Sequence, residues 1–273
     1  MHTRLGRVLT ARLALRFAAL GYLALLLGIP VVLVFINAFQ DGIGAAWDAV
    51  TTPEAQHAFY LTMVMVLVAV PLNTIFGVLC ALAVVRQRFR GRALLNALVD
   101  LPFAVSPVVV GLALLLVYGR RDGWVGEWFA EQGIQIIFST PGMILATIFV
   151  SLPFVAREVI PVLREIGTDQ EQAAATLGAG RLQTFFRVTL PAIRWGVAYG
   201  VVLTTARALG EFGAVSVVSG RLSGRTETAT LFVENRFQRF DETGAYAASV
   251  VLALLALATL LAMNLIKPKE ARA

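Results

Sequence analysis

The sequence predicts an all-α polytopic membrane protein with six transmembrane helices. Apolar residues make up 58% of the 273 residues and charged residues only 15%, whereas soluble domains carry about 25% charged residues. A spanning helix needs about 20 mostly apolar residues. Five charge-free windows approach or exceed that length, namely residues 17–40, 55–85, 101–119, 132–156 and 243–266.

A sixth, weaker window begins at Trp195 and is interrupted by Arg207 and Glu211. It is the fifth span in chain order. Charges at a helix centre are costly, so we expect these two to face protein or water. The first window is longer than the apolar region of a signal peptide, and no clear small-x-small cleavage site follows it. We therefore predict a retained span there.

Basic residues alternate between the two sides of these spans. Four arginines and no acid precede the first span, acids alone follow it, and four arginines without acids follow the second. Since loops rich in Lys and Arg stay in the cytoplasm, we predict that both termini are cytoplasmic. The net charge of +6 then reflects the orientation of the chain in the membrane and does not indicate nucleic-acid binding. Residues 212–243 should lie mainly outside, and we expect part of this segment to re-enter the membrane or pack against the bundle, because the stretch 212–218 is mostly apolar.

The loop between the fourth and fifth spans contains a short predicted helix. Thr168 and Glu171 have the spacing of a capping box, which predicts a helix start. Residues 173–175 are alanines, which leave a smooth face that another protein can approach. Gly178 suits a helix end, and Pro191 suits the first turn of the next helix.

This loop resembles the EAA loop of permease subunits of ATP-binding-cassette (ABC) importers, which docks into a groove on the ATPase. Gln172 stands where that family usually has Glu, and Val188 stands where it has Ile. The other reading is an ordinary cytoplasmic linker with a capped helix. The resemblance implies an ATPase-coupling role for Glu171, Gln172, Ala173, Ala174, Gly178, Leu190 and Pro191.

Longer stretches narrow the resemblance to one kind of importer. Residues 100–109, 152–161, 189–196 and 206–220 resemble the sulfate/thiosulfate permease subunits of ABC importers, in particular those of the CysW type. The last stretch is shared in part with molybdate and tungstate permeases, so the substrate stays open between these oxyanions.

The resemblance implies a type I ABC importer (MetI-like) permease fold in a bacterial plasma membrane. It also implies a second, homologous but non-identical permease, two ATPase subunits and an external sulfate-binding protein. The implied domains are a cytoplasmic arm, residues 1–16, a transmembrane permease domain, residues 17–266, and a cytoplasmic tail, residues 267–273. The coupling loop would occupy residues 157–194 of the permease domain.

Residues for catalysis are missing from the sequence. Its only lysines are Lys267 and Lys269, so it has no phosphate-binding loop. We therefore expect no enzyme activity in this chain, with ATP and Mg bound by the partner ATPase. A single cysteine, Cys80, and two histidines argue against a metal site or a cofactor.

Four residues are candidates for the permeation pathway: Ser106, Arg207, Glu211 and Ser216. Arg207 and Glu211 are four apart and can pair on one helix face. They are either a structural pair, or Arg207 supplies positive potential to an anion path. Asp100 fits the inner membrane interface. A different functional class, an ATPase-independent secondary transporter, usually shows inverted repeats, and we find none.

Overall fold

The computed structural model describes residues 15–121 and 123–266. Nearly all of the predicted arm, residues 1–16, and all of the predicted tail, residues 267–273, lie outside the described residues. The described part is helical, without a strand. It divides into two compact units, one made of the residues up to Thr52 together with Val233–Val251, and the other of Pro53–Phe232 together with the residues from Leu252 onward.

The first unit contains the helix Leu15–Ala38, which includes a π-helical turn, η1 (Ala24–Gly28), and α2 (Ile29–Ala38). The helix α3 (Ile43–Val50) follows, and α14 (Ala229–Gln238) and α15 (Glu242–Ile266) meet here. Asp241 accepts a bond from the Gly244 N–H at 3.0 Å and pairs with Arg236 at 3.1 Å. Asp41 accepts a bond from the Thr243 hydroxyl. Two carboxylates thus hold the start of α15.

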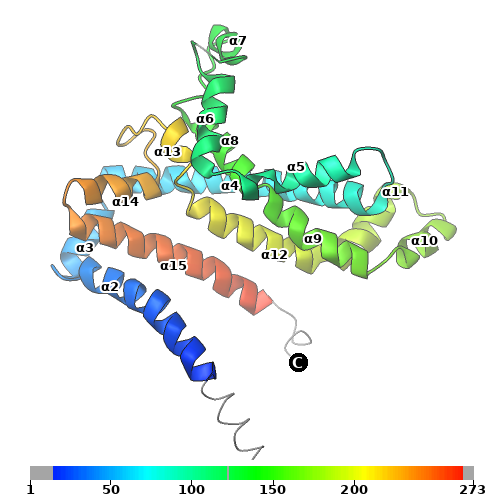
Figure 1. Cartoon of the computed structure of the whole chain (residues 1–273), viewed down its shortest axis with the longest axis horizontal. Helices are drawn as coiled ribbons and strands as arrows, with labels where there is room; N and C mark the ends of the chain where they lie inside the picture. The colour runs from blue at the N-terminus through cyan, green and yellow to red at the C-terminus, as the bar shows by residue number, and fades with distance from the viewer. Residues whose placement is uncertain (1–14, 122, 267–273) are drawn as a thin grey trace, which may run out of the picture. The chain divides into compact units, whose positions relative to one another are not determined.

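The second unit contains the remaining helices (Figure 1). In chain order they are α4 (Pro53–Arg86), α5 (Arg92–Ala104), α6 (Pro107–Tyr118), α7 (Gly126–Glu131), α8 (Thr140–Ser151), α9 (Pro153–Glu165), α10 (Asp169–Thr176), α11 (Arg181–Thr184), the π-helix η2 (Phe185–Thr189), α12 (Leu190–Leu209) and α13 (Val215–Val218).

Helices α4, α9 and α12 pack against one another and form the centre of this unit. Val155 of α9 is fully buried between Gly77 of α4 and Gly200 of α12. A Cβ atom would lie 2.7 Å from the Val155 Cβ at position 77, and 2.6 Å from the Val155 Cα at position 200. Small residues at such contacts let helix backbones approach closely, as is common in membrane bundles.

Within the part of the chain that the structure describes, four helices are long and apolar enough to cross a membrane: Leu15–Ala38, Pro53–Arg86, Thr140–Glu165 and Glu242–Ala262. They match four of the predicted windows, although the helix that matches the window 132–156 begins at Thr140 and not at residue 132. The count becomes five if α5 and α6 form one bent span. The helix α12 lies at the position of the weak window and has 20 residues. It is not among the helices that are both long enough and apolar enough to cross a membrane.

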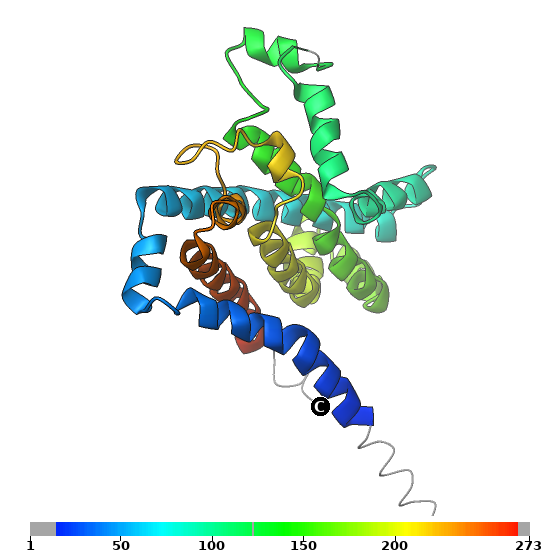
Figure 2. The same cartoon turned by 60° about the vertical axis from the view of Figure 1, so that its left-hand side comes forward.

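The predicted window over residues 101–119 is not one continuous helix. The window crosses a break between α5 and α6, whose axes differ by 112°. Val105 and Ser106 have extended backbones, with ψ of 132° and 136°. Pro107 disfavours the helical conformation in the residue before it and cannot donate a backbone bond, so one helix ends and another begins there. Figure 2 shows α6 turning away from α4.

Candidate functional site

The coupling segment, residues 167–191, lies beyond the ends of α4 and α9 and leads into α12 (Figure 1). Its helix α10 begins directly after Thr168, as predicted. The predicted capping box is wrong, however, because no side chain caps the first turn. The Thr168 hydroxyl instead accepts a bond from the Gln172 amide at 2.9 Å. Glu171 turns toward the spanning helices, where a charged partner offers a stronger bond than a backbone N–H.

Glu171 lies in a polar cluster that joins several helices. Its carboxylate is 2.9 Å from Arg86 Nε at the end of α4, and accepts a bond of 2.9 Å from the Thr189 hydroxyl in η2. Arg86 also donates to the backbone carbonyls of Leu163, at 2.9 Å, and Gly167, at 2.6 Å. We call this cluster the Arg86–Glu171–Thr189 link.

The sequence did not indicate the role of Arg86 or Thr189. Arg86 counted there only as one of four positive charges that set orientation, and Thr189 carried no signal. The structure singles Arg86 out by burial, since its side chain is 15% exposed, whereas its neighbour Arg88 is exposed.

The end of α10 confirms that Gly178 stops the helix. Gly178 has a φ of +84°. The Ala179 N–H bonds to the Ala174 carbonyl and the Gly178 N–H bonds to the Ala175 carbonyl, each at 3.0 Å. This pair of bonds is a Schellman motif, whose left-handed position favours glycine.

An open groove of about 710 Å³ runs between α10 and the start of α12. It is lined by Gln170, Ala173, Ala174, Leu177, Arg187, Val188, Pro191, Ala192 and Arg194. The structure therefore brings the alanines at the start of the predicted motif, Ala173 and Ala174, close to Pro191 at its end. Leu190 lies elsewhere, against the buried cluster that includes Leu163 and Ile193. Leu177, Leu182 and Phe186 add an exposed apolar surface nearby.

Arg207 and Glu211 form the predicted pair. Arg207 Nη1 is 2.6 Å from Glu211 Oε2, and the Glu211 side chain is 1% exposed against 30% for Arg207. Glu211 Oε1 also accepts a bond of 2.8 Å from the Ala214 N–H. The Thr230 hydroxyl donates to the Glu211 carbonyl at 2.7 Å. Glu211 therefore also orders the turn that leads from α12 into α13.

That turn packs against the start of α6. A Cβ on Gly213 would lie 2.9 Å from the Pro107 Cβ. Ala214, Val215 and Val218 are fully buried, which confirms that residues 212–218 pack back against the helices. This contact joins the two segments that carry the candidates Ser106 and Ser216. Ser216 is half-buried and donates to the Gly213 carbonyl at 2.9 Å, whereas Ser106 is exposed at the start of α6.

Asp100 pairs with a residue that the sequence did not assign to it. The Arg157 guanidinium contacts both oxygens of its carboxylate through Nε and Nη2. The pair joins α5 to α9 and is partly exposed. Such a bidentate contact fixes orientation as well as distance.

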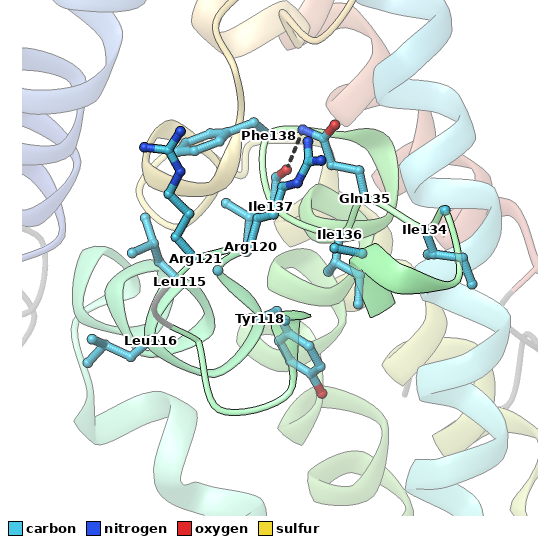
Figure 3. Close-up of a pocket in the computed structure, with 14 residues that line it drawn as sticks. Leu115, Leu116, Tyr118, Arg120, Arg121, Ile134, Gln135, Ile136, Ile137 and Phe138 are labelled. Carbon is cyan, nitrogen blue, oxygen red and sulfur yellow. Dashed lines mark hydrogen bonds between the residues drawn. The ribbon is translucent and has the colours of Figure 1, made fainter. Parts of the chain in front are cut away.

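A separate cavity of about 500 Å³ lies where α6 leads through α7 to α8 (Figure 3). Its walls are mainly apolar, and Arg120 and Arg121 contribute the charges. The Gln135 amide donates to the Ile137 carbonyl at 3.0 Å across one side. None of the predicted site residues lines this cavity. Within the described residues, no group of three or more His, Cys, Asp or Glu side chains is arranged to hold a metal.

Comparison with known proteins gives close relatives. The chain is 54% identical over 251 residues to the sulfate transport system permease protein CysW of Synechocystis, covering 92% of this chain and 91% of the relative. It is 47% identical over 244 residues to CysW of Escherichia coli K12, covering 89% of this chain and 84% of the relative. It is 37% identical over 254 residues to the sulfate transport system permease protein CysT of the same bacterium, covering 93% of this chain and 91% of the relative.

A solved bacterial ABC transporter that imports alginate matches with a TM-score of 0.80 at 19% identity, over 96% of this chain and 97% of that one. This likeness shows a shared fold, the MetI-like ABC permease fold. The model of the family "Binding-protein-dependent transport system inner membrane component" matches residues 73–272. The chain therefore belongs to the family of inner membrane components of binding-protein-dependent transport systems.

Proposed function

We propose that this chain is the transmembrane permease subunit of an ATP-driven importer of sulfate or thiosulfate. It forms half of the translocation pathway and couples to a separate ATPase subunit. One observation carries the proposal, namely the identity of 47–54% to CysW proteins over about nine-tenths of the chain. The chain is not itself an enzyme.

The proposed topology has six spans in the bacterial plasma membrane, with both termini cytoplasmic. The bent pair of α5 and α6 is the third span, and α12 is the fifth. The proposed domains remain an arm over residues 1–16, a permease domain over 17–266 with a coupling loop over 157–194, and a tail over 267–273. The arginine distribution supports this orientation.

Reporter fusions test the topology. Fusions after Arg92 and after Glu171 should both report the cytoplasm, and a fusion within residues 220–225 should report the outside. An external signal at Arg92 or Glu171 contradicts the proposed orientation.

The proposed partners are a second permease, two ATPase subunits and an external receptor. The similarity to CysT as well as CysW supports a homologous, non-identical permease partner. A related alginate transporter has been solved in complex with its periplasmic protein, which supports an external receptor. The groove beside α10 and the exposed Leu177 support ATPase docking at the coupling segment.

In the proposed mechanism, closure of the ATPase subunits around ATP displaces α10 and opens the pathway to the outside. The receptor then releases its oxyanion into the cavity between the two permeases. The half-exposed Arg207 supplies positive potential, while Glu211 holds it in place. Ser106 and Ser216 lie near the same junction and offer hydroxyl groups.

Reconstitution tests the function. The chain is co-expressed with its neighbouring permease, ATPase and receptor genes, purified and placed in proteoliposomes. Uptake and ATP hydrolysis are then measured with receptor loaded with sulfate, thiosulfate, molybdate or tungstate. We expect sulfate and thiosulfate to drive both. Stimulation by molybdate or tungstate alone would favour the related oxyanion importer, and uptake without the ATPase would favour a secondary transporter.

A further inference from the structure

We propose that the Arg86–Glu171–Thr189 link is the connection through which movement of α10 reaches the spanning helices. The inference rests on the proposed function, because it describes how an ATPase bound to α10 would move this permease. Arg86 and Thr189 then act as positioning residues for transport, alongside Glu171.

The first support is that α10 lacks an apolar anchor. None of its residues, Asp169–Thr176, is buried, and it contributes to none of the described hydrophobic clusters. Burial of apolar side chains is what normally holds a helix in place. With that contribution missing, polar contacts must determine where α10 lies.

The second support is the set of elements that the link joins. Arg86 ends α4, Leu163 and Gly167 belong to the end of α9 and the turn after it, and Thr189 directly precedes α12. These three helices are also the ones that pack closely around Val155. Glu171 therefore joins α10 to the ends of all three central helices at one point.

The third support is the strength of the contacts. The Arg86 and Glu171 side chains are 15% and 22% exposed, and the Thr189 residue is 4% exposed. Charge-assisted bonds in such partly dry surroundings are stronger and more directional than surface ion pairs. Arg86 donates hydrogen bonds to the Leu163 and Gly167 carbonyls, while its Nε forms an ion pair with Glu171 without hydrogen-bond geometry. A lysine cannot hold these three partners in the same plane.

The test compares substitutions at the link with the same substitutions at exposed neighbours. Glu171→Gln keeps the shape and the oxygen that Thr189 bonds, but removes the charge that Arg86 meets. Asp169→Asn is its control, because Asp169 is an exposed carboxylate on the same helix. Arg86→Lys is compared with Arg88→Lys, since Arg88 is exposed. Thr189→Val removes only the hydroxyl donor.

The measurement is the number of sulfate ions taken up per ATP hydrolysed in proteoliposomes, with assembly of the complex checked by co-purification of the ATPase. We expect Glu171→Gln and Arg86→Lys to assemble normally and to lower this ratio at least about fivefold, the lower end of typical coupling between sites. The two controls should keep the wild-type ratio. The double variant should fall no further than the worse single variant, because both remove one connection.

Several results would overturn the inference. A wild-type ratio in both Glu171→Gln and Arg86→Lys would show that α10 transmits movement by another route. Failure of both Glu171→Gln and Thr189→Val to assemble would make the link purely structural. If wild-type proteoliposomes take up no sulfate, the proposed function itself fails; if they do and the variants match them, only this inference fails.

Discussion

Two regions of this molecule contain an Arg–Glu ion pair, and the two pairs differ in range and in burial. Arg207 and Glu211 are one helical turn apart, and Glu211 is almost fully buried. Arg86 and Glu171 come from different helices and are 15% and 22% exposed, so neither is as buried as Glu211 nor as exposed as Arg207, which is 30% exposed. The difference suggests different roles, because a buried carboxylate that loses its partner destabilises the fold, whereas a partly exposed contact between elements sets their relative position.

The largest expected effect comes from leaving the buried carboxylate unpaired. Arg207→Gln should destabilise the protein by about 3–5 kcal/mol, the range for breaking a buried pair by removing one partner. The double variant with Glu211→Gln should recover much of that loss. Thermal unfolding of the purified complex and its expression level measure the effect.

Sulfate uptake by the same variants separates the two roles of Arg207. Recovery of both stability and uptake in the double variant would exclude a direct role in attracting the anion. Recovery of stability without uptake would support such a role.

A second prediction concerns the close packing that holds the central helices together. Gly200→Ala places a methyl group against the Val155 backbone, and overpacking of this kind costs about 1–3 kcal/mol. We expect a lower unfolding temperature. Gly28→Ala is the matched control, because nothing lies within 4 Å of a Cβ at that helical position. An unchanged unfolding temperature in Gly200→Ala would contradict the tight contact of α9 with α12.

A third prediction concerns Gly178 and separates backbone strain from docking. Its φ of +84° makes any side chain strained, whereas the space around it is open. Gly178→Ala should cost about 1–2 kcal/mol locally, and Gly178→Asn less, because Asn tolerates this conformation. If the ATPase docks here, less ATPase should co-purify with the Gly178→Trp variant than with either Gly178→Ala or Gly178→Asn. Equal co-purification in all three would count against a docking role.

The smallest expected change in stability is at Ala174, which lines the groove on α10. Ala174→Glu should leave unfolding unchanged, since no residue of α10 is buried. It should lower ATPase co-purification and uptake, because a charge would lie in the proposed contact. Thr176→Glu is the control, because Thr176 is exposed on the same helix and residues two apart do not share a helix face. Normal uptake in Ala174→Glu would contradict the docking surface.

Much of the local structure could be read from the sequence. The end of α10 at Gly178 follows from a residue type that acts within one helical turn. The helix also starts after Thr168 as predicted, although no side-chain cap forms there. The pairing of Arg207 with Glu211 is also local, because residues four apart share a helix face. The motif residues and the longer similar stretches indicated the family, since spacing along the chain survives in the sequence itself.

The local signals failed where a distant partner competed with a near one. Glu171 has the spacing of a capping box, yet its carboxylate meets Arg86 and Thr189. The window over residues 101–119 looks continuous in hydropathy, yet Pro107 and the packing of Gly213 against it accompany a sharp bend. Hydropathy records only how apolar a segment is, and not the direction in which its helix runs.

By itself, the sequence determined that this chain spans a membrane, which family it resembles, and where the helix of the coupling segment begins and ends. Only the tertiary structure decided that Arg86 binds Glu171, that Arg157 binds Asp100, and that the two ends of the motif line one groove. The physical reason is the range of the interactions. Capping, turns and charge-free length act over a few neighbouring residues, whereas these ion pairs form only after helices from distant parts of the chain have packed together.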